Sequence, residues 1–264
     1  MTVDGVQVAR AVLAESARIE GLVLTLTCGQ LSRAEYLAVN KALESLGGKW
    51  NRKQGGHVFV DDPTQALAEF VGGAALAKPP RTSEGYVQTP AGLAAMVIRD
   101  HTDIGRLAAG ARVLEPSAGD GSFVHAAFAA NPEVQVVAVE PNAQRLARIV
   151  ARDSGALRRV SSTFEQFVAS GPGSFDAIVM NPPFAVPGAP SLWIDHVQLA
   201  YGLLSSGARL TAIVPVSLLE RQDRRHSAIR ALTAEHGGFT RLPDDAFKVS
   251  GTGVRTAVMW LRAD

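Results

Sequence analysis

The chain of 264 residues is long enough for one mid-sized domain and a small appendage, and 47% of its residues are hydrophobic, as in an ordinary folded protein. Its 26 basic and 25 acidic side chains nearly cancel, so net charge predicts no nucleic-acid partner, and any basic surface has to be local. One cysteine, Cys28, leaves no internal disulfide and fits a reducing cytoplasm. The first apolar run, from Val12 to Leu26, contains charged residues and predicts neither a signal peptide nor a membrane span. We therefore expect a cytoplasmic protein.

Residues 1–77 are predicted to form a small α+β module. Ser32 to Glu35 has the pattern of a capping box, in which the serine and glutamate side chains each accept a hydrogen bond from a free backbone N–H. Apolar residues then follow at helical spacing until Gly47-Gly48, which can end the helix. After this helix the sequence predicts a turn-rich loop over 50–56, a strand over 57–60 and a helix over 63–71.

The segment Lys78–Gly85 contains two prolines among polar residues and predicts a linker, so the second domain is placed at residues 78–264. From Tyr86 onward, strands and helices alternate, which predicts a parallel sheet covered by helices on both faces. The expected strands are 112–115, 134–140, 159–162, 175–180, 210–214, 239–242 and 255–261, and the expected helices are 91–107, 123–130, 143–153 and 192–204.

A glycine-containing turn follows the first of these strands. Gly119 and Gly121 allow a backbone to approach a ligand closely, and Glu140 ends the next strand. In nucleotide-binding βαβ units, an acid at that place accepts hydrogen bonds from ribose hydroxyls. The spacing matches neither the Gly-x-Gly-x-x-Gly pattern of dinucleotide sites nor a P-loop. A plain glycine turn with an unrelated acid is the simpler alternative.

The tetrapeptide Asn181-Pro182-Pro183-Phe184 directly follows the fourth predicted strand. In a doubly wound sheet that strand lies beside the first, so the tetrapeptide and the glycine turn should face one crevice. The Asn181 side-chain oxygen and the Pro182 carbonyl can accept N–H bonds from an aromatic amine and free its lone pair for attack. Two prolines stiffen the turn, and Phe184 can stack on a planar substrate. The alternative is an ordinary Asn-Pro turn.

From about Gly85 onward the chain resembles the amino-group-specific, N6-adenine DNA methyltransferases. Four segments carry the resemblance, namely 86–90, 113–121, 181–184 and 247–253. The resemblance implies an α/β fold with a doubly wound, mostly parallel seven-stranded Rossmann-like sheet. It also implies S-adenosyl-L-methionine as the cofactor, no metal, and methyl transfer to N6 of an adenine flipped out of duplex DNA.

The resemblance also implies roles for individual residues. It makes Asn181, Pro182, Pro183 and Phe184 catalytic, and it makes Phe184 and Phe247 the aromatic residues that hold the flipped base. The residues implied to bind the cofactor are Tyr86, Thr89, Pro90, Glu115, Pro116, Ser117, Ala118, Gly119, Asp120, Gly121, Phe123, Glu140 and Phe164.

Two features depart from the family pattern. The family often has an acid before the phenylalanine that contacts the adenine of the cofactor, and here Thr163 precedes Phe164, so that contact is lost unless Glu165 supplies it. The family order usually places a target-recognition domain after the last motif, and here the chain stops at Asp264. We therefore expect short or relaxed sequence recognition unless a partner supplies it.

Other acceptors and a non-catalytic role remain as alternatives. RNA-base and protein-glutamine methyltransferases carry a similar Asn-Pro-Pro-Phe/Tyr motif, but the segments 88–90 and 247–252 favour a nucleobase. A binding module that merely kept the fold is the third alternative. The intact pair Gly119 and Gly121, together with Glu140 and Asn181, argues for an enzyme.

Weaker signals leave two interpretations each. Trp50, Arg52, Lys53 and His57 suit phosphate contact and base stacking, and they equally suit a solvated turn with Trp50 in the core of the module. Module 1–77 is accordingly predicted to engage nucleic acid, with sheet coverage or dimer formation as the alternatives. The remaining candidates are Arg221, Arg224, Arg225 and Arg230, which can line a DNA channel or form a solvated helix face, and Asp195 and His196, which suit helix packing better than catalysis.

Overall fold

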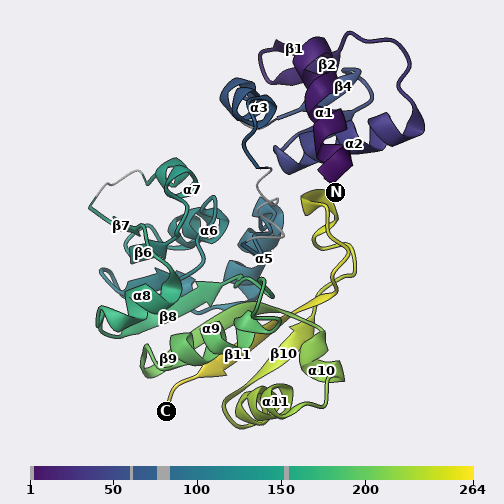
Figure 1. Cartoon of the computed structure of the whole chain (residues 1–264). Coiled ribbons are helices and arrows are strands. Elements are labelled where there is room, and N and C mark those ends of the chain that lie inside the picture. Colours follow the sequence, from purple (N-terminus) through teal and green to yellow (C-terminus); the bar gives the residue numbers. More distant parts are fainter. Residues whose placement is uncertain (1–2, 60–61, 76–83, 152–154) are drawn as a thin grey trace. The chain divides into compact units, whose positions relative to one another are not determined.

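The computed structural model describes residues 3–59, 62–75, 84–151 and 155–264 (Figure 1). The chain divides into two compact units, 1–83 and 84–264, which are described separately. Most of the predicted linker, residues 78–83, lies outside the described residues, as do Val60 of one predicted strand and residues 152–153 of one predicted helix. In the described part of the chain, no helix combines the length and the apolar character that crossing a membrane requires.

Unit 1 is an α+β module with a four-stranded antiparallel sheet in the order β1-β2-β4-β3. The predicted capping box is present, since the Ser32 hydroxyl accepts from the Glu35 N–H at 3.3 Å and the Glu35 carboxylate accepts from the Ser32 N–H at 2.8 Å. Its elements are α1 (Val3–Ser16), β1 (Ala17–Glu20), β2 (Val23–Leu26), α2 (Arg33–Ser45), β3 (Lys49–Asn51), β4 (Gly56–Val58) and α3 (Thr64–Val71).

The core of unit 1 forms between the three helices and the sheet. Leu13 of α1, Leu43 of α2 and Phe70 of α3 are all at most 2% exposed and belong to one apolar cluster. The expected turn over 50–56 is wrong in part, because β3 pairs Trp50 with His57 across a short hairpin. The sequence predicts no elements over residues 3–26, where α1, β1 and β2 lie.

Unit 2 contains a seven-stranded sheet in the order β10-β11-β9-β8-β5-β6-β7. The strands β5 to β9 pair with one another in parallel. β11 is antiparallel to both of its neighbours, β9 and β10. This is the mostly parallel, doubly wound sheet that the sequence predicts. The strands are β5 (Arg112–Glu115), β6 (Gln135–Val139), β7 (Leu157–Val160), β8 (Phe175–Met180), β9 (Leu204–Pro215), β10 (Gly237–Arg241) and β11 (Thr256–Arg262).

Helices cover both faces of this sheet, and alternate residues of β8 show the division. Ala177 and Val179 belong to one buried cluster, whereas Ile178 and Met180 belong to the other. The first cluster is completed by α5 (Ala91–His101), α6 (Ser122–Ala130) and α7 (Ala143–Arg148). The second is completed by α8 (Phe164–Ala169), α9 (Leu192–Tyr201), α10 (Ser217–Glu220) and α11 (Arg224–His236), and the 3₁₀ turns η1 (Ile104–Arg106) and η2 (Lys248–Ser250) complete the unit.

Several predicted helix ends are wrong. The helix expected over 91–107 ends at His101, and the helix expected over 143–153 ends at Arg148. The helix expected over 192–204 ends at Tyr201, because Leu204 already pairs with Phe175 as the first residue of β9. Apolar spacing alone carries no stop signal at these places, and strand pairing and loop packing supply it.

Candidate functional site

A cavity of about 320 Å³ lies in unit 2 at the carboxyl ends of β5, β6, β7 and β8. This is where the strand order reverses, because β6 and β8 flank β5 on opposite sides. Ligands of doubly wound proteins bind at this point, and the volume falls in the range of roughly 300–1,000 Å³ typical of small-molecule sites. Most of its wall comes from the segments 84–89, 115–123, 140–145, 163–165 and 181–186 and from α9.

The glycine turn after β5 is held close to its neighbours. Gly119 has φ +52°, and a side-chain carbon there would lie 2.9 Å from the ring of Tyr86. Gly121 has φ +83° at the start of α6, and a side-chain carbon there would lie 2.9 Å from Ile149. Both glycines are required by backbone conformation and by close packing. Gly119 lines the cavity and Gly121 does not, so Gly121 shapes the turn.

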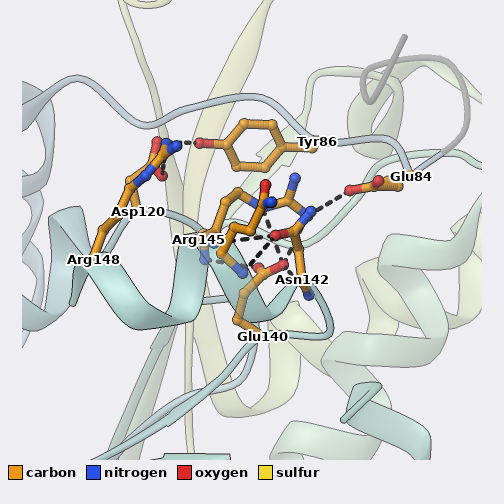
Figure 2. A network of polar contacts seen from close by, with 9 residues as sticks. Glu84, Tyr86, Asp120, Glu140, Asn142, Arg145 and Arg148 are labelled. Carbon is orange, nitrogen blue, oxygen red and sulfur yellow. Dashed lines mark hydrogen bonds and ion pairs between the residues drawn. The ribbon is translucent and has the colours of Figure 1, made fainter. Parts of the chain in front are cut away.

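Glu140 holds the turn after β6 to the glycine turn (Figure 2). Its Oε2 accepts the Gly119 N–H at 3.0 Å, and its Oε1 accepts the Asn142 N–H at 2.9 Å. Arg145 donates to the same Oε1 from Nε at 3.0 Å and from Nη2 at 2.7 Å. Because Oε1 already accepts three bonds, Oε2 is the atom with capacity for a ligand.

Arg145 links Glu140 to the segment that begins unit 2. Its Nη2 also donates to Glu84 (Figure 2), and its guanidinium lies 4.3 Å from the centre of the Tyr86 ring. Tyr86 in turn donates its hydroxyl to Asp120 at 2.6 Å. Burial, the bond to Asp120 and the negative charge of Asp120 raise the pKa of Tyr86 above its usual value, so Tyr86 acts as a neutral hydrogen-bond donor. This network ties residues 84–86 to the glycine turn after β5 and to the turn after β6.

Glu115 is an acid buried at the end of β5. It is 2% exposed, it lines the cavity, and its Oε1 has no hydrogen-bond partner among the described residues. Burial raises its pKa well above the ordinary value, and the negative charge of Glu140 adds to that effect while a backbone bond from Ser117 opposes it. An unpaired buried carboxyl is costly, so a ligand that supplies a positively charged donor would relieve it.

Asn181 is held in one orientation by the segment 84–89. Its Nδ2 donates to the Val87 carbonyl at 3.3 Å and to Thr89 Oγ1 at 3.0 Å. Thr89 is itself fixed, because its carbonyl accepts the Ser122 hydroxyl at 2.7 Å. Since both amide hydrogens point at protein acceptors, Oδ1 is left as the acceptor for a substrate, and no described residue bonds it.

Most of the residues predicted to form the site line this one cavity. They include Asn181, Pro182, Pro183 and Phe184, and from the cofactor set Tyr86, Thr89, Glu115, Pro116, Ser117, Ala118, Gly119, Asp120, Phe123, Glu140 and Phe164. Pro90 does not line it, because Pro90 caps the start of α5.

Phe247 lies in a different place from the one expected for a residue that binds substrate. It is 2% exposed, it packs in the apolar cluster with Leu242 and Val258, and it does not line the cavity. A buried ring of this kind cannot stack on a base without leaving the core. The expectation for Phe247 is therefore corrected to a packing role, and Phe184 is the half-buried aromatic residue of the turn after β8 at the cavity.

Several cavity residues lie outside the site that the sequence predicts. Arg145 follows Glu140 by five positions, but nothing in the sequence indicates that it turns back onto that acid. Glu84 is a half-exposed end of the same network. The other cavity residues outside the predicted site set are Gly85, Val87, Gln88, Ser122, Pro141, Thr163, Glu165, Val186, Leu192 and His196.

The arginines proposed for a DNA channel are largely engaged within unit 2. Arg225 pairs with Asp195 at 2.6 Å, and Arg221 pairs with Asp223 at 3.2 Å. Arg230 donates to the carbonyls of Leu218 and Arg221. These contacts favour the helix-face interpretation. Among the described residues there is no group of three or more side chains that could hold a metal ion.

Comparison with known proteins places the fold. No protein-family model matches the chain, and no curated protein matches it. A putative class I S-adenosylmethionine-dependent methyltransferase from Listeria monocytogenes matches with a TM-score of 0.54 and 14% identity over 100% of this chain and 89% of that one. Unit 2 has a Rossmann-like methyltransferase fold.

Two further structures match over part of their length. The M protein of the type I restriction enzyme EcoKI matches with a TM-score of 0.51 and 18% identity over 77% of this chain and 51% of that one. TrmN from Thermus thermophilus matches with a TM-score of 0.47 and 20% identity over 66% of this chain and 49% of that one. The chain thus spans about half the length of these two proteins.

Proposed function

We propose that this protein is an S-adenosylmethionine-dependent methyltransferase that methylates an exocyclic amino nitrogen, with N6 of adenine in DNA as the acceptor. The observation that carries the proposal is the hydrogen bonding of Asn181. Its amide hydrogens are held by Val87 and Thr89, which leaves Oδ1 as an acceptor at a cavity that Glu140 also lines. One cavity therefore combines a carboxylate suited to bind ribose hydroxyls with an amide suited to bind an amine.

The cavity residues fit S-adenosylmethionine, which supplies a methyl group bound to a positively charged sulfur. Glu140 Oε2 has remaining capacity to accept from a ribose hydroxyl. The unpartnered Oε1 of buried Glu115 suits the ammonium group at the amino-acid end of the cofactor. Phe164, beside the cavity, suits the flat adenine ring.

The chemistry requires orientation of the amine more than proton removal. Asn181 Oδ1 and the Pro182 carbonyl accept the two N–H groups, which draws the nitrogen toward tetrahedral geometry and frees its lone pair. The nitrogen then forms the new bond to the methyl carbon, while the bond from that carbon to sulfur breaks and its electron pair stays on sulfur. One N–H proton leaves to solvent after the attack, so no titrating base is needed in the transfer step.

We take adenine in DNA as the acceptor because the family resemblance implies it and because the last residue of the Asn-Pro-Pro-Phe motif is aromatic. Phe184 lines the cavity and is half-buried, so it can stack on a base that has left the duplex. The fold of an M protein from a type I restriction enzyme is similar, and that is compatible with this choice of acceptor. Unit 1 adds an exposed Trp50 beside Arg52 and Lys53, which suits nucleic-acid contact.

The deciding experiment is methyl transfer from tritiated S-adenosylmethionine to DNA, RNA and protein, with the modified product identified by mass spectrometry. We expect N6-methyladenine in DNA, and we expect Asn181→Ala to abolish most of the incorporation. Label in RNA or in protein glutamine, with none in DNA, would show that the proposed acceptor is wrong and that the proposed methyl-transfer reaction is right. No incorporation in any acceptor, together with no binding of the cofactor, would overturn the proposed function.

A further inference from the structure

The loop between β10 and β11 borders the cavity at the carboxyl edge of the sheet. β11 begins at Thr256, which pairs with Pro215 at the end of β9, so the residues just before Thr256 lie at the edge where the parallel strands end. In this loop the Ser250 hydroxyl donates to the carbonyl of Gln88 at 2.7 Å. Gln88 lines the cavity, so the turn η2 is fixed to the cavity wall.

The tip of this loop carries an apolar side chain in solvent. Val249, in the middle of η2, is 81% exposed, which is the largest value among the large hydrophobic residues that the structure describes. Val254, later in the same loop, is exposed as well. Single exposed apolar residues are common on proteins, but this one shares its loop with a second, and the loop borders a cavity.

The backbone holds Val249 in place from both sides. Phe247 before it is buried in the core, and the Phe247 carbonyl accepts the N–H of Ser250 at 3.0 Å and the N–H of Thr252 at 3.4 Å. Thr252 after it is also buried. The tip is therefore pre-organised, and a partner that binds it pays little conformational entropy to order it.

The charges of the loop do not favour a row of phosphates. Residues 249–254 include no charged side chain, and the two cations beside them, Lys248 and Arg255, are offset by the two aspartates at 244–245. Arg255 also pairs with Glu220 at 3.0 Å. An uncharged tip suits an uncharged partner surface, such as the faces of stacked bases, better than the DNA backbone.

A second uncharged loop borders the cavity directly after the Asn-Pro-Pro-Phe turn. Residues 185–191 include no charged side chain, and Val186 lines the cavity. This loop packs on Gly85, where a side-chain carbon would lie 2.6 Å from the Ala185 carbonyl oxygen. The segment before α5 thus contacts one uncharged loop at Gly85 and the other at Gln88.

We propose that Val249 enters the base stack of duplex DNA and fills the gap that the target adenine leaves. This rests on the proposed function. Asn181 lines a cavity, so an amino group in a duplex reaches it only after its base has left the stack. The gap exposes the faces of the neighbouring bases to water, and an apolar side chain that fills it offsets part of that cost. Val249 combines exposure, a fixed backbone and a place beside the cavity.

The test compares methylation of random-sequence DNA as duplex and as single strands by the full chain. An adenine in a single strand leaves no gap in a duplex, so Val249 should matter for duplex DNA alone. We expect Val249→Ala to lower kcat/KM on duplex about tenfold, as for the lost burial of two methyl groups. Val249→Leu keeps the apolar bulk and should stay near wild type. Val150→Ala, at another exposed valine just after α7, is the control.

A modified duplex separates loss of the gap-filling side chain from general damage to the loop. In a duplex that the wild type methylates, a pyrene nucleotide placed opposite the target adenine occupies the gap from the side of the DNA. It should restore Val249→Ala to nearly the wild-type rate, because the missing side chain is then replaced. The Tm of Val249→Ala and its affinity for S-adenosylhomocysteine should equal those of the wild type.

Three outcomes would overturn this inference and leave the proposed methyl transfer standing. In the first, Val249→Ala changes the rates on duplex and single strands equally or changes neither. In the second, pyrene does not restore the variant. In the third, the wild type methylates single strands and no duplex, so that no base leaves a stack. If the wild type methylates DNA in neither form, the proposed acceptor fails and this inference fails with it.

Discussion

The side-chain amide of Asn181 donates to Thr89 Oγ1 at 3.0 Å across a sequence separation of 92 residues. The segment before α5 thus sets the orientation of the proposed catalytic amide, and Val87 holds the same amide from a second direction at 3.3 Å. An amide that is free to rotate would present nitrogen or oxygen to the cavity, whereas this one presents oxygen.

Replacing Thr89 with valine should therefore impair turnover more than cofactor binding. Valine keeps the shape of threonine but cannot accept the Asn181 N–H, so Asn181 loses one of its two restraints. We expect kcat to fall about tenfold, in line with a lost hydrogen bond of about 1–1.5 kcal/mol, with little change in affinity for S-adenosylhomocysteine. The exposed Thr240→Val is the matched control and should behave as wild type. An unchanged kcat in Thr89→Val would contradict the restraint.

Asn181→Ala should lose turnover while keeping the cofactor. Its Oδ1 is proposed to accept from the reacting nitrogen, and removing one such group typically costs about 10²–10³ in kcat. Single-turnover methylation and calorimetry with S-adenosylhomocysteine measure the two effects separately. In a double-mutant cycle, Thr89→Val should add almost nothing to Asn181→Ala, because the interaction that it supports is already gone. Near-wild-type turnover in folded Asn181→Ala would remove Asn181 from the mechanism.

Glu140→Gln should weaken binding of S-adenosylmethionine by roughly tenfold or more, since a charged acceptor for the ribose is lost. The change also leaves Arg145, whose side chain is 10% exposed, with fewer negative partners. Thermal unfolding therefore has to be recorded beside calorimetry, and we expect a lower Tm. The exposed Glu133→Gln serves as the control. A folded Glu140→Gln with wild-type affinity would show that the ribose is bound elsewhere.

Binding of the cofactor should release a proton from Glu115. Burial holds the pKa of this carboxyl well above its ordinary value, so the free protein keeps it protonated at any pH below that raised pKa, and the ammonium group of the ligand favours the charged form. Affinity should then rise with pH up to the pKa of Glu115 in the free protein. Calorimetry in two buffers of different ionisation enthalpy measures the released proton, and Glu115→Gln should abolish that release.

The Glu115 carboxyl also makes the stability of the protein depend on pH. Its pKa in the folded state lies above the unfolded value of about 4.3, so the folded state binds more protons between those two values. Stability of the free protein therefore falls as pH rises through that window. Glu115→Gln should lack that part of the decline. Its free energy of unfolding should therefore increase relative to that of the wild type as pH rises. A constant difference in unfolding free energy from pH 4 to 8 would argue against a raised pKa.

Trp50→Ala should weaken DNA binding without affecting the cofactor. Trp50 is 54% exposed on the β3–β4 hairpin next to Arg52 and Lys53, and stacking of a base on an aromatic side chain is worth about 1–3 kcal/mol. Fluorescence anisotropy with a labelled duplex and with a single strand measures the effect. Tyr36→Ala, another exposed aromatic residue of unit 1, is the control. Equal affinity for DNA in all three proteins would exclude the hairpin from the interface.

The sequence by itself determined the features that depend on neighbouring residues. The capping box of α2 and the alternation of buried strands with helices are local patterns, and the doubly wound sheet follows from them because parallel strands need helical crossovers. The common location of the glycine turn and Asn181 also followed, since the carboxyl ends of adjacent parallel strands meet at one edge.

Only the tertiary structure decided which side chain reaches which partner. It buried Phe247 in the core, exposed Trp50, and turned Arg145 back onto Glu140. The pairing of Glu165 with His196 joins two helices that are separated by a strand and a loop. No local pattern encodes such contacts, because a side chain's direction in space depends on how whole elements pack, and packing is set by the sum of many weak apolar contacts across the chain.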